Sequence, residues 1–390
     1  MYFFVCTNYH ILVALVARCH FNDEKNKILI ISDRITDAEI IYDRIIAEGL
    51  WDRVILFRSK SLEFKEELSR PRKILNLIAL KCRVERFIRK EKIEKICTFT
   101  VGDQTANFFS ASKVPGETYL CEDGTFPYYA GIEMYDHASV RPDFVKKNNK
   151  EGVGLSLTDS FKFFLDDMFL SGYIIRAGTW FNSVFLLIDG LYNASYDSFP
   201  HAIKPLKCDM ASTDIAFTAA SRIFNYKAND FYKNVDVVFV DSGMVSTDYL
   251  SMEDQVDYSF KLLARFGEKN IAWKLGPYCD QKKVDYIRTL IVGNDNLSLE
   301  LENKSVPWEV IFFNNKESLS QANVTTYMST AAFSPLLFFG IKTDVTILSK
   351  LVSKHKKMSP LYQLLHYRYC SFADSIRNYY PDNIIDIPES

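Results

Sequence analysis

Short apolar runs alternate with amphipathic segments over the first third of the chain. Apolar residues recur at helical spacing in residues 11–20, 38–48 and 74–90. Strands that are continuous apolar runs and that alternate with helices are typical of a parallel sheet covered on both faces. Such runs predict five buried strands, at residues 2–6, 27–32, 54–57, 95–100 and 118–121.

The same alternation resumes near residue 234. Apolar runs predict strands at residues 235–240, 270–274, 323–328 and 345–348, the last of these being the final strand. Helical spacing predicts helices at residues 253–266, 284–292, 318–322 and 361–380, and residues 307–313 fit either a strand or a helix.

Between these two regions, residues 161–192 are aromatic and apolar but interrupted by glycines, which favours helices. The pattern as a whole predicts an α/β protein with two Rossmann-like domains facing a cleft. The expected bounds are residues 1–230, with a helical insertion at about 135–230, then 231–361, and a C-terminal helix and tail at 362–390. We expect that last helix to return to the first domain. Ligands of such sheets bind at the carboxyl ends of the strands.

Charge and cysteine content narrow the class of protein. The chain has 390 residues, and its 47 Lys and Arg nearly balance its 49 Asp and Glu, which argues against nucleic-acid binding. The eight cysteines show no metal-ligand spacing, so we expect reduced thiols, no metal and a cytoplasmic location. No window of about 18 uncharged apolar residues predicts a spanning helix. P-loop, dinucleotide-binding, HExxH and GxSxG motifs are absent from the sequence.

Glu122, Asp123 and Gly124 directly follow the predicted strand 118–121. A carboxylate at a strand end is placed for general-base catalysis, and glycine lets the backbone turn there. Because adjacent residues leaving a strand point to opposite sides, only one carboxylate faces the cleft, and we favour Asp123 over Glu122. Asp254, at the start of a predicted helix, is the rival base. The alternative for the tripeptide is a plain surface turn, since Asp-Gly is a common turn dipeptide.

Loops after strands of the second region offer groups that bind anions. Backbone amides of glycine loops and hydroxyl groups at helix starts suit phosphate. The alternatives are an ordinary Gly-Pro loop and an N-cap serine, and N-caps far outnumber phosphate sites. The candidate donor-binding residues are Ser242, Gly243, Lys274, Gly276, Pro277, Tyr278, Ser329 and Thr330.

The order of these segments resembles the bacterial sialyltransferases, most nearly glycosyltransferase family 52. The resemblance covers roughly residues 2–349, and because each motif is short it depends on order and spacing. The matching segments are Val5-Cys-Thr-Asn-Tyr-His-Ile11, Glu122-Asp123-Gly124, Val237-Val-Phe-Val-Asp-Ser-Gly243, Pro307-Trp308-Glu309 and Tyr327-Met-Ser-Thr-Ala331.

The resemblance implies an inverting, metal-independent and cofactor-free transfer on a GT-B scaffold. A sialic acid or related nonulosonic acid would pass from a CMP-activated donor to an oligosaccharide or glycolipid acceptor, in capsule or lipo-oligosaccharide synthesis. The first domain would bind the acceptor and the second the donor. Glu309 would bind the ribose hydroxyls. Monomer and homodimer both remain open.

One departure from the family concerns a His-Pro motif whose His contacts the donor phosphate. The matching loop here has Gly276 before Pro277, and no His-Pro occurs in the chain. Lys274 or Tyr278 would then take the role of the missing His. Two alternatives stay open: a transferase that uses another nucleotide sugar, and a glycosyltransferase-fold assembly protein without turnover.

A basic segment, residues 350–357, precedes the aromatic helix 361–380. Lysines beside an apolar, aromatic helix suit peripheral binding to the anionic inner face of the cell membrane. The alternative is a solvated turn before a helix that bridges the domains.

Overall fold

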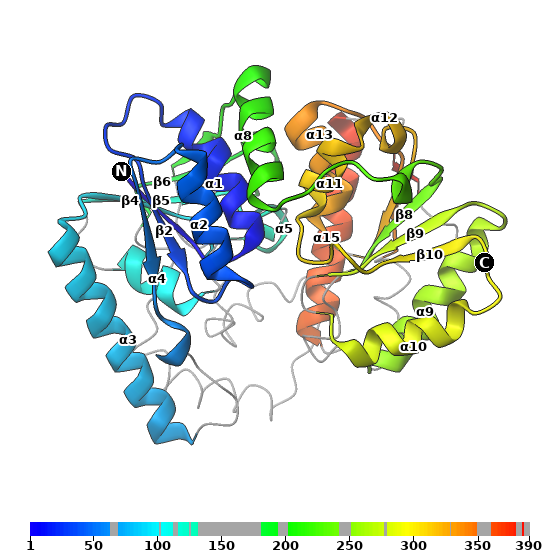
Figure 1. Cartoon of the computed structure of the whole chain (residues 1–390), viewed down its shortest axis with the longest axis horizontal. Coiled ribbons are helices and arrows are strands. Elements are labelled where there is room, and N and C mark those ends of the chain that lie inside the picture. The colour runs from blue at the N-terminus through cyan, green and yellow to red at the C-terminus, as the bar shows by residue number, and fades with distance from the viewer. Residues whose placement is uncertain are drawn as a thin grey trace. The chain divides into compact units, whose positions relative to one another are not determined.

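The computed structural model describes residues 1–62, 69–100, 103–111, 116–124, 126–131, 181–193, 202–241, 251–276, 279–327, 329–348, 360–379 and 384–385. The chain divides into two compact units, Met1–Asn225 and Tyr226–Ser390 (Figure 1). Each unit is built on its own parallel sheet.

The first unit contains a seven-stranded sheet in the order β3-β2-β1-β4-β5-β6-β7, in which every pairing is parallel. The order reverses between β1 and β4, and such a switch point opens a crevice at the carboxyl ends of the strands. The strands are β1 (Tyr2–Val5), β2 (Ile28–Ser32), β3 (Arg53–Phe57), β4 (Lys95–Thr98), β5 (Glu117–Cys121), β6 (Ser183–Leu186) and β7 (Ile203–Pro205).

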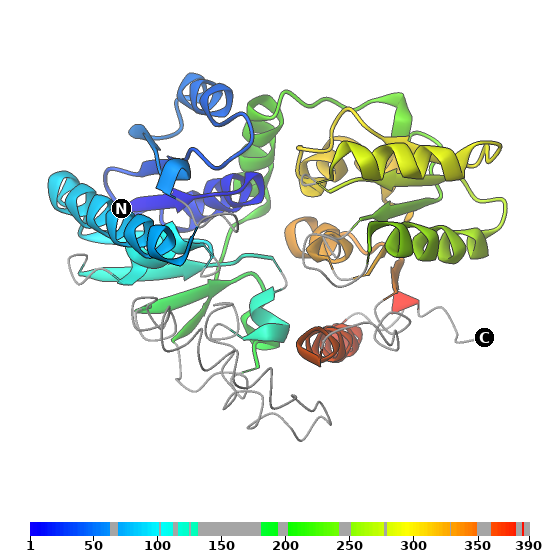
Figure 2. The ribbon, with the colours of Figure 1, turned by 90° about the horizontal axis from the view of Figure 1, so that it is seen from below.

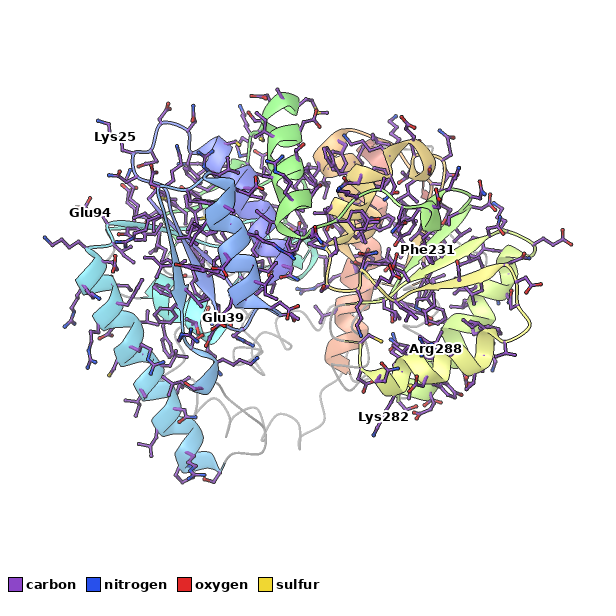
Figure 3. The ribbon with its side chains drawn as sticks, viewed as in Figure 1. Lys25, Glu39, Glu94, Phe231, Lys282 and Arg288 are labelled. Carbon is purple, nitrogen blue, oxygen red and sulfur yellow. The ribbon has the colours of Figure 1, made fainter. Side chains whose placement is uncertain are left out.

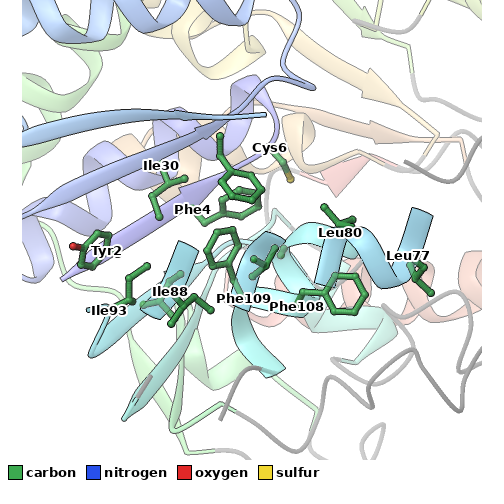
Figure 4. Close-up of a cluster of buried hydrophobic side chains, with 14 residues drawn as sticks. Tyr2, Phe4, Cys6, Ile30, Leu77, Leu80, Ile88, Ile93, Phe108 and Phe109 are labelled. Carbon is green, nitrogen blue, oxygen red and sulfur yellow. The ribbon is translucent and has the colours of Figure 1, made fainter. Parts of the chain in front are cut away.

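Helices cover the sheet of the first unit, and alternation along β1 places side chains on both of its faces. Phe4 belongs to a buried cluster with α3 and α4, where its ring centroid lies 4.7 Å from that of Phe109 (Figure 4). Phe3 contacts Trp51 instead, at 5.2 Å between ring centroids, and α8 packs against α1 and α2 (Figure 2). The helices are α1 (Asn8–His20), α2 (Ala38–Glu48), α3 (Arg70–Glu91), α4 (Gln104–Ala111), α5 (Phe126–Ala130) and α8 (Met210–Ile223).

The second unit repeats the arrangement with a six-stranded sheet in the order β10-β9-β8-β11-β12-β13, again parallel throughout. Its switch point lies between β8 and β11. The strands are β8 (Val237–Val240), β9 (Ile271–Lys274), β10 (Leu297–Glu300), β11 (Asn323–Thr326), β12 (Val345–Ile347) and β13 (Ile384–Ile385).

Helices of the second unit pack on its sheet through aromatic and branched side chains. Phe239 and Trp273 share a buried cluster with residues of α9 and α10. Phe333 contacts Phe372 of α15, with 5.6 Å between their ring centroids. The helices are α9 (Met252–Leu263), α10 (Gln281–Ile291), α11 (Trp308–Asn314), α12 (Lys316–Leu319), α13 (Ser334–Phe339) and α15 (Pro360–Tyr379).

Most predicted elements are confirmed, and two assignments change: that of residues 183–186 and that of the final strand. Ser183–Leu186, expected to be helical, is the strand β6, because these four residues are buried and bridge β5 and β7. Residues 307–313 correspond to the helix α11. Strand 345–348 is not the final one, since β13 pairs beyond it. The C-terminal helix α15 contacts Phe333 in the second unit, and its return to the first domain stays a prediction.

Each unit carries charged side chains on its outside, although some others, such as Glu122 and Lys274, are buried. Lys25 and Glu94 in the first unit, and Lys282 and Arg288 in the second, extend into solvent (Figure 3). Among the helices of the described residues, none has the length and apolar character needed to cross a membrane. The basic segment 350–357 lies outside the described residues.

Candidate functional site

The carboxyl edge of the first sheet carries the two candidate carboxylates. Glu122 and Asp123 follow β5, and Cys6 follows β1 at the same edge. The two acids separate by environment: Glu122 is fully buried, whereas the Asp123 side chain is 21% exposed. Asp123 is therefore the carboxylate of the pair that is accessible to a substrate.

Gly124 adopts φ = 67°, in the left-handed region. An L residue pays a steric cost in that region, so glycine is needed for the turn that follows the two acids. We expect Gly124→Ala to lower the free energy of unfolding by about 1–2 kcal/mol. Gly116→Ala is the matched control, because its Cβ would meet only the Glu94 carbonyl oxygen at 3.7 Å. Equal effects of both substitutions in chemical unfolding would contradict the expectation.

Only one oxygen of the Glu122 carboxyl group accepts hydrogen bonds from the described residues. Its Oε2 accepts hydrogen bonds from the Tyr128 hydroxyl, at 2.5 Å, and from the Leu187 amide, at 2.6 Å. Its Oε1 is buried and has no hydrogen-bond partner among the described residues. Burial raises the pKa of Glu122 to about 8, against the lowering effect of these two donors. The carboxyl is consequently protonated at neutral pH, and the buried Oε1 is the oxygen available to carry the proton.

The Asp123 carboxylate is paired with a buried histidine. Its Oδ1 lies 2.9 Å from Nε2 of His10, whose residue is 1% exposed. On the other side of the imidazole, Nδ1 lies 3.4 Å from the Cys6 sulfur and 3.5 Å from the Cys6 amide nitrogen. His10 lies within the motif 5–11 of the sequence but was not selected there as a candidate site residue. The available signal was its position, five residues beyond the end of β1 at the same edge.

A further ion pair lies at this edge. Asp103 is buried, accepts from the Ala106 amide at 2.8 Å and pairs with the Arg34 guanidinium. Arg34 follows β2 and Asp103 follows β4, so the pair ties together two loops on either side of β1. Sequence reasoning did not select either residue.

At the carboxyl end of β8 in the second unit, Asp241 is locked in a buried ion pair. Its Oδ2 lies 2.5 Å from Nζ of Lys283, and Gln255 donates to its Oδ1 at 3.3 Å. Burial raises the pKa of Asp241, and the lysine opposes that rise. Ser242 and Gly243, predicted to bind the donor, lie outside the described residues.

Lys274 ends β9 and is turned into the second unit. Its Nζ donates to the carbonyl oxygens of Leu275, at 2.9 Å, and Lys304, at 3.2 Å. Burial lowers the pKa of Lys274 to about 8, although Glu300, Glu309 and other acids oppose the shift. In this arrangement the ammonium group donates hydrogen bonds to backbone carbonyl oxygens. Pro277 and Tyr278, predicted beside it, lie outside the described residues.

Gly276 follows in the same loop. A Cβ added there would lie 3.6 Å from the Asp241 carbonyl oxygen, which is ordinary van der Waals contact. Unlike Gly124, it does not adopt a positive φ. The position therefore accepts a Cβ without backbone strain.

The remaining candidates occupy helix starts in the second unit. Glu309, in the first turn of α11, is 4% exposed, and burial raises its pKa to about 7. Ser329 caps a short 3-10 helix, its Oγ accepting from the Ala331 amide at 3.2 Å, and Thr330 begins that helix. This is the N-cap role that we weighed as the alternative for Ser329. Asp254 lies in the first turn of α9, where its amide donates to Ser251 Oγ at 3.0 Å.

The candidates thus fall into two groups. Glu122 and Asp123 lie together in the first unit, while Asp254, Lys274, Gly276, Glu309, Ser329 and Thr330 belong to the second. Within the described part of the chain, no cluster of three or more His, Cys, Asp or Glu residues has the arrangement of a metal site.

Comparison with known proteins identifies the fold. No protein-family model matches the sequence, and no curated protein sequence matches it. A structure of S. aureus MnaA with UDP is similar over 98% of this chain and 89% of that one, at 11% identity and a TM-score of 0.50. A Listeria monocytogenes structure described as a UDP-N-acetylglucosamine 2-epimerase is similar over 96% and 88%, at 10% identity and a TM-score of 0.52. At these identities the likeness concerns the fold alone: the chain has the α/β fold of two Rossmann-like units that is called GT-B.

Proposed function

We propose that this protein is a metal-independent, inverting glycosyltransferase that moves a sugar from a nucleotide donor to a hydroxyl group of a saccharide. The observation that carries the proposal is the Asp123 carboxylate, which is partly exposed at the carboxyl end of β5 and has one oxygen bonded to His10. The other oxygen, Oδ2, is then available to take a proton. Ligands of parallel α/β sheets bind at this edge, and a general base must lie within hydrogen-bond reach of the proton that it takes.

The proposed step balances without a cofactor. The acceptor oxygen forms a bond to the anomeric carbon of the sugar while its proton passes to Asp123. The bond between the anomeric carbon and the phosphate oxygen breaks, and its electron pair leaves with the nucleotide. Attack from the face opposite the leaving group inverts the anomeric configuration. Fixed amide, hydroxyl and cationic groups stabilise the charge that develops on the phosphate.

Two observations bear on the donor. The order of the sequence motifs favours a CMP-activated nonulosonic acid such as sialic acid, and a role in capsule or lipo-oligosaccharide synthesis. One similar structure contains UDP, and this favours UDP-sugars as the second donor class. The absence of the His-Pro motif supports an alternative function, that of an assembly protein which binds a nucleotide sugar without transferring it.

A donor screen tests the function. Full-length protein is incubated with CMP-sialic acid or UDP-sugars, with and without oligosaccharide acceptors and EDTA, and products are followed by NMR. We expect nucleotide release coupled to a glycoside of inverted anomeric configuration, unaffected by EDTA. Donor binding without any product would favour the assembly protein. Rearranged donor with no transfer would favour an epimerase, and absence of all binding would contradict the proposal.

Restoring the missing histidine tests the donor assignment. The resemblance places a phosphate-binding His where this chain has Gly276, and the position accepts a Cβ at 3.6 Å from the Asp241 carbonyl oxygen. One added charge-assisted hydrogen bond is worth about 1.5 kcal/mol, or roughly a tenfold change in affinity. We expect Gly276→His to tighten the binding of a CMP-sugar by about that factor in calorimetry. Gly276→Ala is the control, and an equal gain from alanine would contradict the assignment.

A further inference from the structure

His10 joins two segments of the first unit that are far apart in the sequence. Its Nε2 contacts Asp123 Oδ1 at 2.9 Å across 113 positions, and its Nδ1 faces the Cys6 amide and sulfur. His10 is 1% exposed and Cys6 is 7% exposed. The imidazole therefore links the loop after β1 to the loop after β5, and the Asp123 side chain is the exposed end of this connection.

The contacts of the imidazole determine where its proton lies. A backbone amide can only donate, so the nitrogen that faces the Cys6 N–H, Nδ1, must act as the acceptor. The Cys6 thiol, at 3.4 Å, can donate to the same nitrogen. With Nδ1 unprotonated, the ring proton is on Nε2 and is donated to Asp123. The tautomer thus follows from the hydrogen bond that the second ring nitrogen makes.

The ring is also held mechanically. The His10 amide donates to Oγ1 of Thr7, the N-cap of α1, at 3.1 Å, which fixes the backbone of the first helical turn. The imidazole stacks on Phe99, with 5.9 Å between ring centroids and planes 28° apart. Phe99 is fully buried beyond the end of β4. Neighbours on three elements consequently restrict the direction in which Nε2 points.

We propose that His10 is a positioning residue: its Nε2–H holds Asp123 Oδ1 and so presents Asp123 Oδ2 as the basic oxygen. The proposal rests on the proposed function in that Asp123 is the general base. His10 takes no proton from the acceptor. It acts by restricting the Asp123 side chain to the orientation in which Oδ2 faces the acceptor hydroxyl. Misplacement of a reacting group by about 1 Å costs about 10²-fold in rate, and this is the effect expected when His10 is lost.

The first test is spectroscopic and independent of activity. In full-length protein with ¹⁵N-labelled histidine, long-range ¹H–¹⁵N NMR distinguishes a protonated from an unprotonated ring nitrogen. We expect His10 to show a protonated Nε2 and an unprotonated Nδ1. Asp123→Asn should shift the Nε2 resonance because the acceptor changes from a carboxylate to an amide. A proton on Nδ1, or no response to Asp123→Asn, would overturn the proposal.

The second test is kinetic. We expect His10→Ala to lower kcat by about 10²-fold with little change in KM, and His10→Gln to recover part of the loss because its amide can donate to Asp123. In the Asp123→Asn background, His10→Ala should add little, since both residues act through one group. Equal losses for His10→Ala and His10→Gln, or additive losses in the double variant, would overturn the positioning role.

Leu12→Ala is the matched control for packing. Leu12 is fully buried in the same helix, so its truncation also removes buried side-chain atoms from the first unit. It should lower thermal stability while leaving kcat nearly unchanged, and a 10²-fold loss in this control would assign the His10 effect to packing. If the NMR results hold but Asp123→Asn retains full activity, the proposed function fails while the hydrogen-bonded geometry stands.

Discussion

Asp123→Asn is expected to lower turnover by about 10²–10⁴-fold, the usual contribution of a general base, while donor binding stays nearly unchanged. Asparagine has the same shape and keeps an oxygen that can accept from His10 Nε2, so the local fold is preserved. What it removes is the basic second oxygen. The measurement is kcat and KM with saturating donor, together with calorimetric donor affinity for both proteins.

Asp254→Asn is the control for this prediction. Asp254 lies in the first turn of α9, where a carboxylate interacts favourably with the positive end of the helix dipole. Losing this charge should lower the free energy of unfolding by only a fraction of a kcal/mol. Its substitution should leave turnover close to that of the native protein. Near-full activity of Asp123→Asn combined with an inactive Asp254→Asn would transfer the general base to the second unit.

The free energy of unfolding of the native protein should fall as the pH rises, and Glu122→Gln is expected to abolish that fall. The pKa of Glu122 is raised to about 8 in the folded protein and returns to an ordinary value near 4.5 on unfolding. Between these values the folded state binds more protons than the unfolded state, so the free energy of unfolding falls as the pH rises. The slope is about 1.4 kcal/mol for each pH unit, which accumulates to an order of 5 kcal/mol by pH 8.

Glutamine imitates the protonated carboxyl, since its oxygen can accept from Tyr128 and Leu187. In urea unfolding at a series of pH values from 5 to 9, the free energy of unfolding of the variant should therefore increase relative to that of the native protein as the pH rises. Glu94→Gln, at an exposed glutamate, should run parallel to the native protein. Parallel curves for Glu122→Gln as well would mean that the buried carboxyl is not protonated in the folded state.

The local pattern of the chain predicted the elements that depend on local forces. Strand β1 was predicted as a continuous apolar run, and all four of its residues are buried, because a sheet covered on both faces buries its central strands. The end of α2 was predicted at residue 48, and Gly49, which follows it, adopts φ = 63°. By contrast β6 was mistaken for a helix, since four buried residues have no periodicity of their own and the neighbouring strands decide their conformation.

The sequence by itself determined the fold class and placed Glu122 and Asp123 at the end of a strand. It did so because both features depend on residues that are close together in the sequence: the alternation of strands and helices, and the Asp-Gly turn. Only the tertiary structure decided that Glu122 is buried and protonated, that Asp123 is partly exposed, and that His10 contacts Asp123 from 113 positions away. Burial and hydrogen bonds between distant segments depend on the proximity of the loops after β1 and β5 at one edge of the sheet. The residues of either loop alone do not specify that proximity.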